Sequence, residues 1–354
     1  MNPFLFCLLL AGFLSATGCY SHPPKPFMDG IGGEEAVFNE IEDEFKKELM
    51  QYPEGSELPV TNFKEIWAYL VSGREGALNP DTPISDLCYF GADVDSYGKL
   101  IDVPNYRNIR GFPGRTHFVA ICSGRALTHF VLAEGSRERK ELIRDILEAA
   151  KPYHGLQIDF EYVPARDGAA FLSFLGELRA GLGNKVFSIA LPARTRTLKD
   201  DVYDYVKIKP LVDRIFVMAY DEHWSTSAPG PIASMDWCQR VALHAYETIG
   251  KDKLIMGLPF YGRSWGSIAT NKAYLHSGIV ELMEEHNITE INRENGIPTF
   301  RFELPVSVAV FYEDDYSLST RLQMYQKIGV DAVGFWRLGQ ETPAFWPLIA
   351  LSSY

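Results

Sequence analysis

One short apolar segment carries three polar side chains that could do acid–base chemistry, His154-Gly155-Leu156-Gln157-Ile158-Asp159-Phe160-Glu161-Tyr162. Successive side chains of a β-strand point to opposite faces, so Gln157, Asp159 and Glu161 share one face. A carboxylate that enters an apolar interior costs free energy unless it is paired or used. The spacing therefore predicts a catalytic pair of carboxyl groups. A solvated or salt-bridged pair is the alternative.

The surrounding segments alternate between apolar runs and amphipathic stretches, a pattern typical of βαβ units and a parallel sheet. We expect strands at Glu65–Val71, Asp86–Ala92, His117–Cys122, Leu156–Tyr162, Val186–Leu191, Ile215–Tyr220, Leu254–Pro259 and Ala332–Trp336. Helical patterns cover Arg137–Ala150, Ala169–Leu182, Met235–Ile249 and Leu318–Ile328, whereas 72–85 has no helical period. Eight strands predict an α/β fold of the closed (β/α)₈ type, a TIM barrel. Enzymes of this fold keep their sites at the carboxyl ends of the strands.

The stretch from Trp265 to Val310 is too long for a simple loop. It contains one helical pattern, Gly278–His286, and two short β-like pieces, Thr299–Glu303 and Val306–Phe311. We expect a small insertion after the seventh strand, at about residues 266–310, that forms one wall of a cleft.

The segment at 154–162 resembles the DGxDxDxE signature of glycoside hydrolase family 18, the chitinase-like family, with His154 and Gln157 in place of two of its Asp residues. Three further segments resemble the sixth, seventh and eighth strands of that family: Asp213–Asp221, which ends in Met-x-Tyr-Asp, Leu254–Arg263, and Gly334-Phe335-Trp336. The continuation with His223-Trp224 and Pro229-Gly230-Pro231 most resembles the bacterial spore-cortex and peptidoglycan-acting branch.

This resemblance implies substrate-assisted hydrolysis with retained configuration at a β-linked N-acetylglucosamine (GlcNAc). Glu161 would protonate the leaving oxygen, and Asp159 would hold the acetamido N–H and stabilise the oxazolinium charge. Tyr220 would donate its hydroxyl to the acetamido oxygen, and Asp221 would bind the sugar or the same network. Plain packing for Tyr220, and a structural cap of a loop for Asp221, are the alternatives.

Further substrate-binding residues follow from the same resemblance. Trp336 would form the apolar floor beneath the sugar, and Gln157 could hydrogen-bond Asp159. The other residues expected to line the site are Met218, Tyr261 and Trp224. Packing alone is the alternative for Met218 and Trp336. No metal or cofactor motif is present in the sequence, and the implied mechanism needs neither.

The net charge of the chain limits the kinds of partner that it can bind. The 354 residues include 34 Lys and Arg and 46 Asp and Glu, a formal net charge of −12, which argues against a nucleic-acid partner. The function that these features favour is an exported glycosidase acting on a GlcNAc-containing polymer of peptidoglycan or chitin type. The alternatives are an inactive or weakly active sugar-binding lipoprotein, and a surface protein that uses the barrel only as a scaffold.

The N-terminus predicts export. Residues 3–14 form an uncharged apolar run, as in a signal peptide over 1–18, and Ala16-Thr17-Gly18-Cys19 resembles a bacterial lipobox. We expect a lipid on Cys19 that anchors the protein to a membrane, in the periplasm or at the cell surface. A tether with a short helix would cover 19–62 and the barrel 63–354. Cys88 and Cys122 are expected to be buried free thiols.

Overall fold

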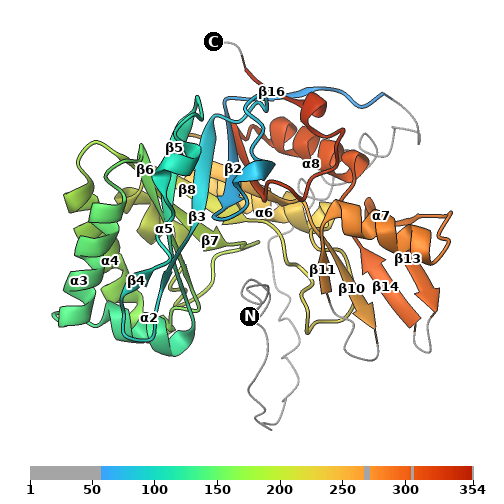
Figure 1. Cartoon of the computed structure of the whole chain (residues 1–354). Coiled ribbons are helices and arrows are strands. Elements are labelled where there is room, and N and C mark those ends of the chain that lie inside the picture. The colour runs from blue at the N-terminus through green and yellow to red at the C-terminus, as the bar shows by residue number, and fades with distance from the viewer. Residues whose placement is uncertain (1–56, 267–271, 304–306, 353–354) are drawn as a thin grey trace, which may run out of the picture.

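The computed structural model describes residues 57–266, 272–303 and 307–352 (Figure 1). The signal-peptide, lipobox and N-terminal helix predictions fall on residues outside those ranges. In the described part of the chain, no helix combines the length and the apolar character that a membrane span requires.

Eight parallel strands close into a barrel, which confirms the predicted fold. They are β2 (Glu65–Val71), β3 (Asp86–Val94), β5 (Arg115–Ser123), β6 (Gly155–Glu161), β7 (Val186–Pro192), β8 (Arg214–Met218), β9 (Leu254–Pro259) and β15 (Ala332–Trp336). Neighbours in the sheet follow in chain order, and β2 closes the circle by pairing with both β15 and β3. The short β4 (Leu100–Ile101) runs antiparallel to the end of β3.

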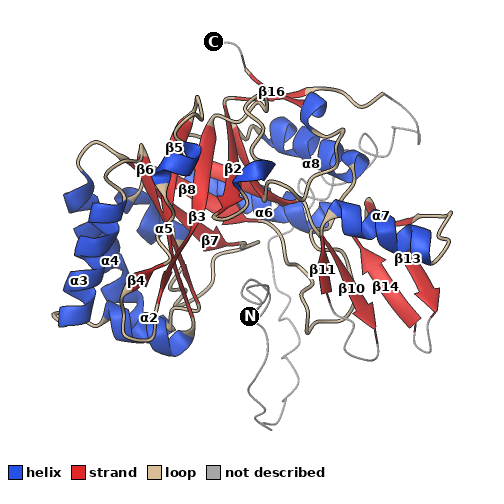
Figure 2. Cartoon of the chain, viewed as in Figure 1, coloured by secondary structure: helices blue, strands red, loops and turns tan. Residues whose placement is uncertain are grey.

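Helices surround the barrel, as Figure 2 shows in blue. They are α2 (Arg125–Leu132), α3 (Arg137–Ala149), α4 (Gly168–Leu182), α5 (Tyr205–Ile208), α6 (Met235–Ile249) and α8 (Asp315–Ile328), with short 3₁₀ turns η1 (Glu75–Ala77), η2 (Tyr106–Ile109), η3 (Ala165–Asp167), η4 (Lys209–Leu211) and η5 (Trp346–Leu348). All four predicted helices are present, and the described 72–85 segment has only the turn η1. Local chemistry explains the bounds of α8, because Asp314 and Ser317 form a capping box and Gly329 ends the helix at φ 96°.

Aromatic side chains fill the barrel interior. Trp67, Tyr69 and Phe216 are fully buried there with Cys88. Phe216 lies so close to two strands that glycine is required opposite it: a Cβ on Gly257 or Gly334 would lie 2.6 or 2.3 Å from its ring. The free thiols of Cys88 and Cys122 are buried, as predicted.

The amino ends of the strands, the floor of the barrel, hold an ion-pair network. Arg214 Nη2 on β8 lies 2.8 Å from Glu65 Oε1 on β2, and Arg115 Nε lies 2.7 Å from Asp86 Oδ1. The buried His117 Nε2 is 2.7 Å from the same Asp86 oxygen. Arg115 Nη2 also lies 3.0 Å from Glu65 Oε1, so these pairs tie four strands, β2, β3, β5 and β8, together at the end of the barrel opposite the carboxyl ends.

The segment after β9 folds as a five-stranded antiparallel sheet with one helix. Its elements are β10 (Gly262–Gly266), β11 (Lys272–Tyr274), α7 (His276–Glu285), β12 (Asn292–Glu294), β13 (Ile297–Glu303) and β14 (Ser307–Phe311), in the order β11-β10-β14-β13-β12. Three of these match the predicted helix and β-like pieces, whereas β10, β11 and β12 have no counterpart in the sequence prediction. The sheet starts at Gly262, before the expected 266, because β10 pairs with β14 from Arg263 onward.

The insertion is fastened to the barrel. Phe300 and Val310 pack on α7 on one face of the sheet, and Trp265 and Phe311 pack beside Tyr261 on the other. At the β12–β13 turn, Asn295 Oδ1 accepts from the first turn of α6, at Asp236 N (3.2 Å). A further parallel pair, β1 (Thr61–Phe63) with β16 (Ile349–Leu351), joins the two ends of the described chain.

Candidate active site

Strand β6 presents its three polar side chains at increasing height, as the alternation predicts. Gln157 is fully buried, Asp159 is 7% exposed, and Glu161 at the carboxyl end of the strand is partly exposed. The intervening Leu156, Ile158 and Phe160 pack outward into the core that the helices cover. The carboxyl groups therefore lie at the mouth of the barrel, its carboxyl-terminal end.

Gln157 lies beneath the carboxyl pair and is held from two other strands. Tyr69 donates its hydroxyl to Gln157 Oε1, and Gln157 Nε2 donates to Ser188 Oγ at 3.3 Å. We expected this side chain to contact a ligand or Asp159. The observed hydrogen bonds go instead to Tyr69 and Ser188, and the amide is fully buried. Gln157 therefore supports the carboxyl pair from below.

His154 lies at the opposite end of β6. Its Nδ1 accepts from the Thr116 backbone N–H at 3.0 Å, one residue before the strand begins. Seven residues of strand separate it from Glu161, about 23 Å at 3.3 Å per residue. The substitution at His154 therefore affects the floor of the barrel and leaves the carboxyl pair untouched.

The two carboxyl groups influence each other strongly. Burial raises the pKa of Asp159 well above its usual value, and the nearby charge of Glu161 raises it further. Burial also raises the pKa of Glu161, with a further contribution from the charge of Asp221. Asp159 Oδ1 is buried without a hydrogen-bond partner among the described residues. A buried acceptor in that state favours a proton or an incoming N–H donor.

Tyr220 follows β8 by two residues and enters the same interior. Its ring packs against the barrel-interior cluster, together with Met218 and Trp336. Burial raises the pKa of its phenol well above the usual value, and the charge of Asp159 adds to the effect. The hydroxyl therefore remains a proton donor at all pH values at which the carboxyl groups titrate.

Asp221 is held in a left-handed backbone conformation, φ 57°, which Asp tolerates better than most residues. Tyr261 donates its hydroxyl to Asp221 Oδ1 at 2.5 Å, and Arg263 Nη2 lies 3.4 Å from the same oxygen. Its side chain is still 46% exposed. Asp221 therefore contacts Arg263 of the insertion, and its negative charge raises the pKa of Glu161.

Two tryptophans lie at the mouth. Trp336, at the end of β15, packs edge-on against Tyr69 and Phe90, with ring centroids 5.2 and 4.8 Å apart. Trp224 is 51% exposed, on the loop after β8. The buried Trp265 of β10 donates its indole N–H to the Trp224 carbonyl at 3.1 Å. The insertion therefore holds the loop that carries Trp224.

The structure brings together the predicted catalytic and substrate-binding residues, and it adds Tyr69, Ser188 and Phe90. These three come from β2, β7 and β3, far away in sequence. Tyr69 carried one signal, a hydroxyl within the otherwise apolar Ile66–Val71 run. A hydroxyl on a buried strand needs a partner.

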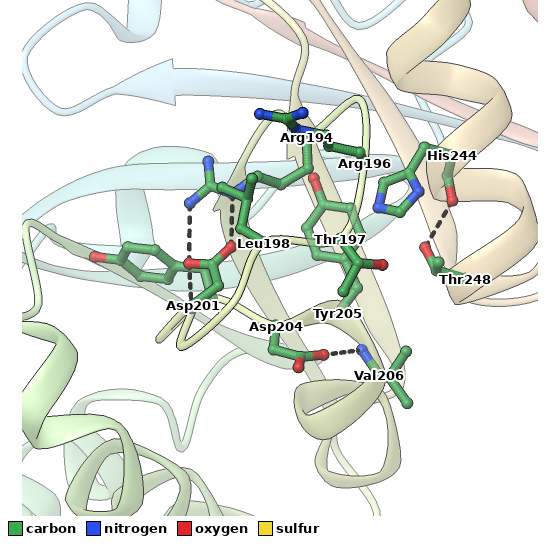
Figure 3. Close-up of a pocket in the computed structure, with 11 residues that line it drawn as sticks. Arg194, Arg196, Thr197, Leu198, Asp201, Asp204, Tyr205, Val206, His244 and Thr248 are labelled. Carbon is green, nitrogen blue, oxygen red and sulfur yellow. Dashed lines mark hydrogen bonds and ion pairs between the residues drawn. The ribbon is translucent and has the colours of Figure 1, made fainter. Parts of the chain in front are cut away.

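No group of three metal-ligating side chains occurs within residues 57–266, 272–303 and 307–352. A shallow hollow lies between the β7–α5 connection and α6, lined by Arg194, Arg196, Asp201, Tyr205 and His244 among others (Figure 3). None of the carboxyl groups of β6 lines it.

A closed parallel barrel with a carboxyl pair at the end of β6 defines a glycosidase-type site, and comparison with known proteins identifies its family. The model of glycosyl hydrolases family 18 matches residues 102–341, so the chain belongs to that family.

Individual proteins and solved structures are also similar to this chain. The chain is 29% identical over 226 residues to the glycosylase YvbX of Bacillus subtilis (strain 168). The aligned segment covers 60% of this chain and 65% of that protein. The structure of the Bacillus cereus spore cortex-lytic enzyme SleL superimposes with a TM-score of 0.71 at 21% identity, covering 84% of this chain and 76% of that one. A mutant class V chitinase from Cycas revoluta, in complex with (GlcNAc)₃, gives 0.66 at 18%, covering 80% and 97%. The chain spans about half to two thirds of the length of its first curated relatives.

Proposed function

We propose that the protein hydrolyses β-linked N-acetylglucosamine glycans with retention of configuration, and that the substrate's own acetamido group is the nucleophile. The observation that carries this proposal is the Asp159–Glu161 pair at the mouth, in which Asp159 Oδ1 is buried and unpartnered among the described residues. An acetamido N–H can donate a hydrogen bond to this oxygen, and an apolar ligand cannot.

Glu161 is the general acid. Burial raises its pKa above the ordinary value of a glutamate, so the carboxyl group keeps its proton to a higher pH, in the direction that this role requires. As the bond from C1 to the glycosidic oxygen breaks, Glu161 gives its proton to that oxygen and the acetamido carbonyl oxygen bonds to C1. Water then attacks C1 and gives a proton to Glu161. This attack opens the oxazolinium ring and restores the acid form of Glu161.

Asp159 and Tyr220 act on the acetamido group. Asp159 Oδ1 accepts its N–H and offsets the positive charge that develops on the oxazolinium ring. Tyr220 donates to the acetamido oxygen and fixes it beside C1. Trp336 supplies the apolar surface beneath the sugar.

For the substrate, the proposal covers glycan strands of peptidoglycan and chitin-type oligomers. The similarity to a spore cortex-lytic enzyme and to a chitinase solved with (GlcNAc)₃ supports both classes. The proposal also includes export and a lipid on Cys19, supported by the apolar run and the lipobox-like segment. Metabolic labelling with a fatty acid tests the lipid: the parent should carry label that the Cys19→Ser variant lacks.

The test of activity is hydrolysis of chitin oligomers and purified peptidoglycan by the full chain, with new reducing ends identified by mass spectrometry. Glu161→Gln should abolish product while sugar binding remains. Glu134→Gln is the matched control, since Glu134 is exposed and outside the site. Parental turnover in Glu161→Gln would refute the assignment. Calorimetric binding of GlcNAc oligomers with no product from the parent would favour a sugar-binding protein.

A further inference from the structure

The carboxyl end of β6 is paired on one side only. The pairing of β6 with β5 continues to Glu161, whereas its pairing with β7 ends at Ile158. Strand β7 itself continues to Pro192 beside β8. In the described part of the chain, the last three residues of β6, which carry both carboxyl groups, therefore have no strand partner on the β7 side. Because buried backbone groups need hydrogen-bond partners, a group other than a strand must supply them there.

The hydroxyl of Tyr203 supplies these hydrogen bonds. Tyr203 is buried and lies on the connection between β7 and α5. Its hydroxyl donates to the carbonyl of the buried Phe160 at 2.9 Å and accepts from the N–H of the buried Val163 at 2.9 Å. A hydroxyl group can donate and accept at the same time. One oxygen atom thus joins the backbone before Glu161 to the backbone after Tyr162, and we call this pair of hydrogen bonds the Tyr203 bridge.

The two residues inside the bridge are the proposed general acid and a residue with an unfavourable backbone. Tyr162 has φ 60°, in the left-handed region that bulky side chains rarely adopt. Its side chain is 56% exposed, so packing of its own ring does little to hold this conformation. A strained backbone persists only where the surrounding structure fixes it. The bridge does so, since it holds the peptide groups on both sides.

Tyr203 is itself held from two sides. Its backbone N–H donates to Asp201 Oδ1 at 3.1 Å, and Arg194 binds the same carboxylate through Nε at 2.6 Å and Nη2 at 3.1 Å, as the dashed lines in Figure 3 show. Its ring packs edge-on against Phe171 of α4, with centroids 6.1 Å apart. It lies in the core that the helices cover, with Phe160, whose side chain points away from the carboxyl groups. Tyr203 therefore reaches β6 from the outer side of the barrel, away from the sugar.

We propose that Tyr203 is a positioning residue for Glu161, because its bridge fixes the carboxyl group where it can protonate the leaving oxygen. This inference rests on the proposed glycosidase function and adds to it a residue that does not touch the substrate. A general acid must lie within hydrogen-bond reach of the atom that it protonates. A displacement of about 1 Å can lower the rate about 100-fold. Without the bridge, the strained segment of Glu161 and Tyr162 is free to relax and to carry the carboxyl group with it.

The experiment compares two substrates that differ in their need for an acid. The first is the chitin tetramer, or a peptidoglycan tetrasaccharide if the parent cleaves only that, whose leaving sugar oxygen must take a proton from Glu161. The second is 2,4-dinitrophenyl β-chitobioside, whose phenolate keeps the electron pair of the broken bond and leaves without that proton. In Tyr203→Phe, kcat/KM should fall about ten- to thirty-fold on the tetrasaccharide and less than about two-fold on the dinitrophenyl glycoside. The KM for the tetrasaccharide should change little, because Tyr203 does not contact the sugar.

Two variants calibrate this comparison. Glu161→Gln should show the same selectivity with a larger effect. Tyr205→Phe is the matched control: Tyr205 is buried two residues further along the chain, and its hydroxyl donates to the Pro192 carbonyl at 2.7 Å without contacting β6. Its loss should lower the urea midpoint of unfolding but leave the ratio of the two kcat/KM values unchanged. If Tyr203→Phe does not fold, Asp201→Ala, which removes the acceptor of the Tyr203 N–H, should shift that ratio in the same direction to a smaller extent.

A parallel fall on both substrates, or an unchanged ratio, would overturn the proposal. Hydrogen exchange of the Val163 amide tests the bridge without turnover: exchange should be about five- to ten-fold faster in Tyr203→Phe than in the parent, and an unchanged rate would show that the bridge is absent. Parental turnover of the tetrasaccharide by Glu161→Gln, or a parent that cleaves neither substrate, would refute the glycosidase function and with it the catalytic part of this inference. The exchange rate then still decides whether the bridge exists.

Discussion

The hydrogen bond from Tyr69 to Gln157 provides a sharp test of how the site is supported. In Tyr69→Phe the ring remains and only the hydroxyl is lost, so Gln157 Oε1 is left buried without that donor. An unsatisfied buried acceptor costs about 1–3 kcal/mol. For a chain of this length, that corresponds to a fall in Tm of roughly 1–4 °C.

Activity should fall as well. Gln157 lies directly beneath Asp159 on one face of β6, and its amide is oriented by Tyr69 on one side and Ser188 on the other. Without the Tyr69 hydroxyl the amide can rotate, and the packing beneath Asp159 loosens. We expect kcat to fall by about three- to ten-fold, while KM changes little because neither side chain touches the sugar.

The assays are urea-induced unfolding, followed by circular dichroism, and steady-state kinetics on the GlcNAc oligomer that the parent cleaves. Tyr97→Phe is the matched control, since Tyr97 is 75% exposed. In the double variant Tyr69→Phe, Gln157→Met both partners become apolar, and part of the lost stability should return. Equal unfolding midpoints for Tyr69→Phe and Tyr97→Phe, or strictly additive effects of the two substitutions, would refute the reasoning.

Three further predictions concern charge. Asp221→Asn removes a negative charge that raises the pKa of Glu161, so the alkaline limb of the kcat/KM profile should move to lower pH; an unmoved limb would contradict this electrostatic link. Glu313→Gln leaves Arg321 charged and fully buried beside it (the ion pair is 3.0 Å), and calorimetry or urea unfolding should show a loss of about 3–5 kcal/mol; a loss below 1 kcal/mol would contradict it. Partial burial raises the pKa of Glu65, but the hydrogen bonds from Arg214 and its neighbours outweigh this and lower it to about 2, so the stabilisation by the Arg214 pair is complete above pH 4.5 and is lost as the pH falls towards 2. Glu65→Gln should therefore flatten the acid limb of the stability curve, and a limb that stays parallel to that of the parent would count against the pair.

The chemistry of the site could be predicted from the sequence because it is local. Alternation along a strand places Asp159 and Glu161 on one face whatever the rest of the chain does. The same local periodicity predicts β2, β9, β15 and α6 with the bounds that the structure has. These segments are strongly patterned, so tertiary packing has little reason to shift their ends.

Only the tertiary structure decides which distant residues meet. Tyr69 lies 88 residues from Gln157, and closure of the barrel brings them together. Asn295 caps α6 from a hairpin 59 residues away. The short strands β10, β11, β12, β1 and β16 have three to five residues and carry little apolar periodicity, so they owe their existence to pairing partners. His154 and Gln157 appear from the sequence to be comparable departures within one motif. The direction and length of β6 separate them, since one ends at the floor and the other directly beneath the catalytic pair.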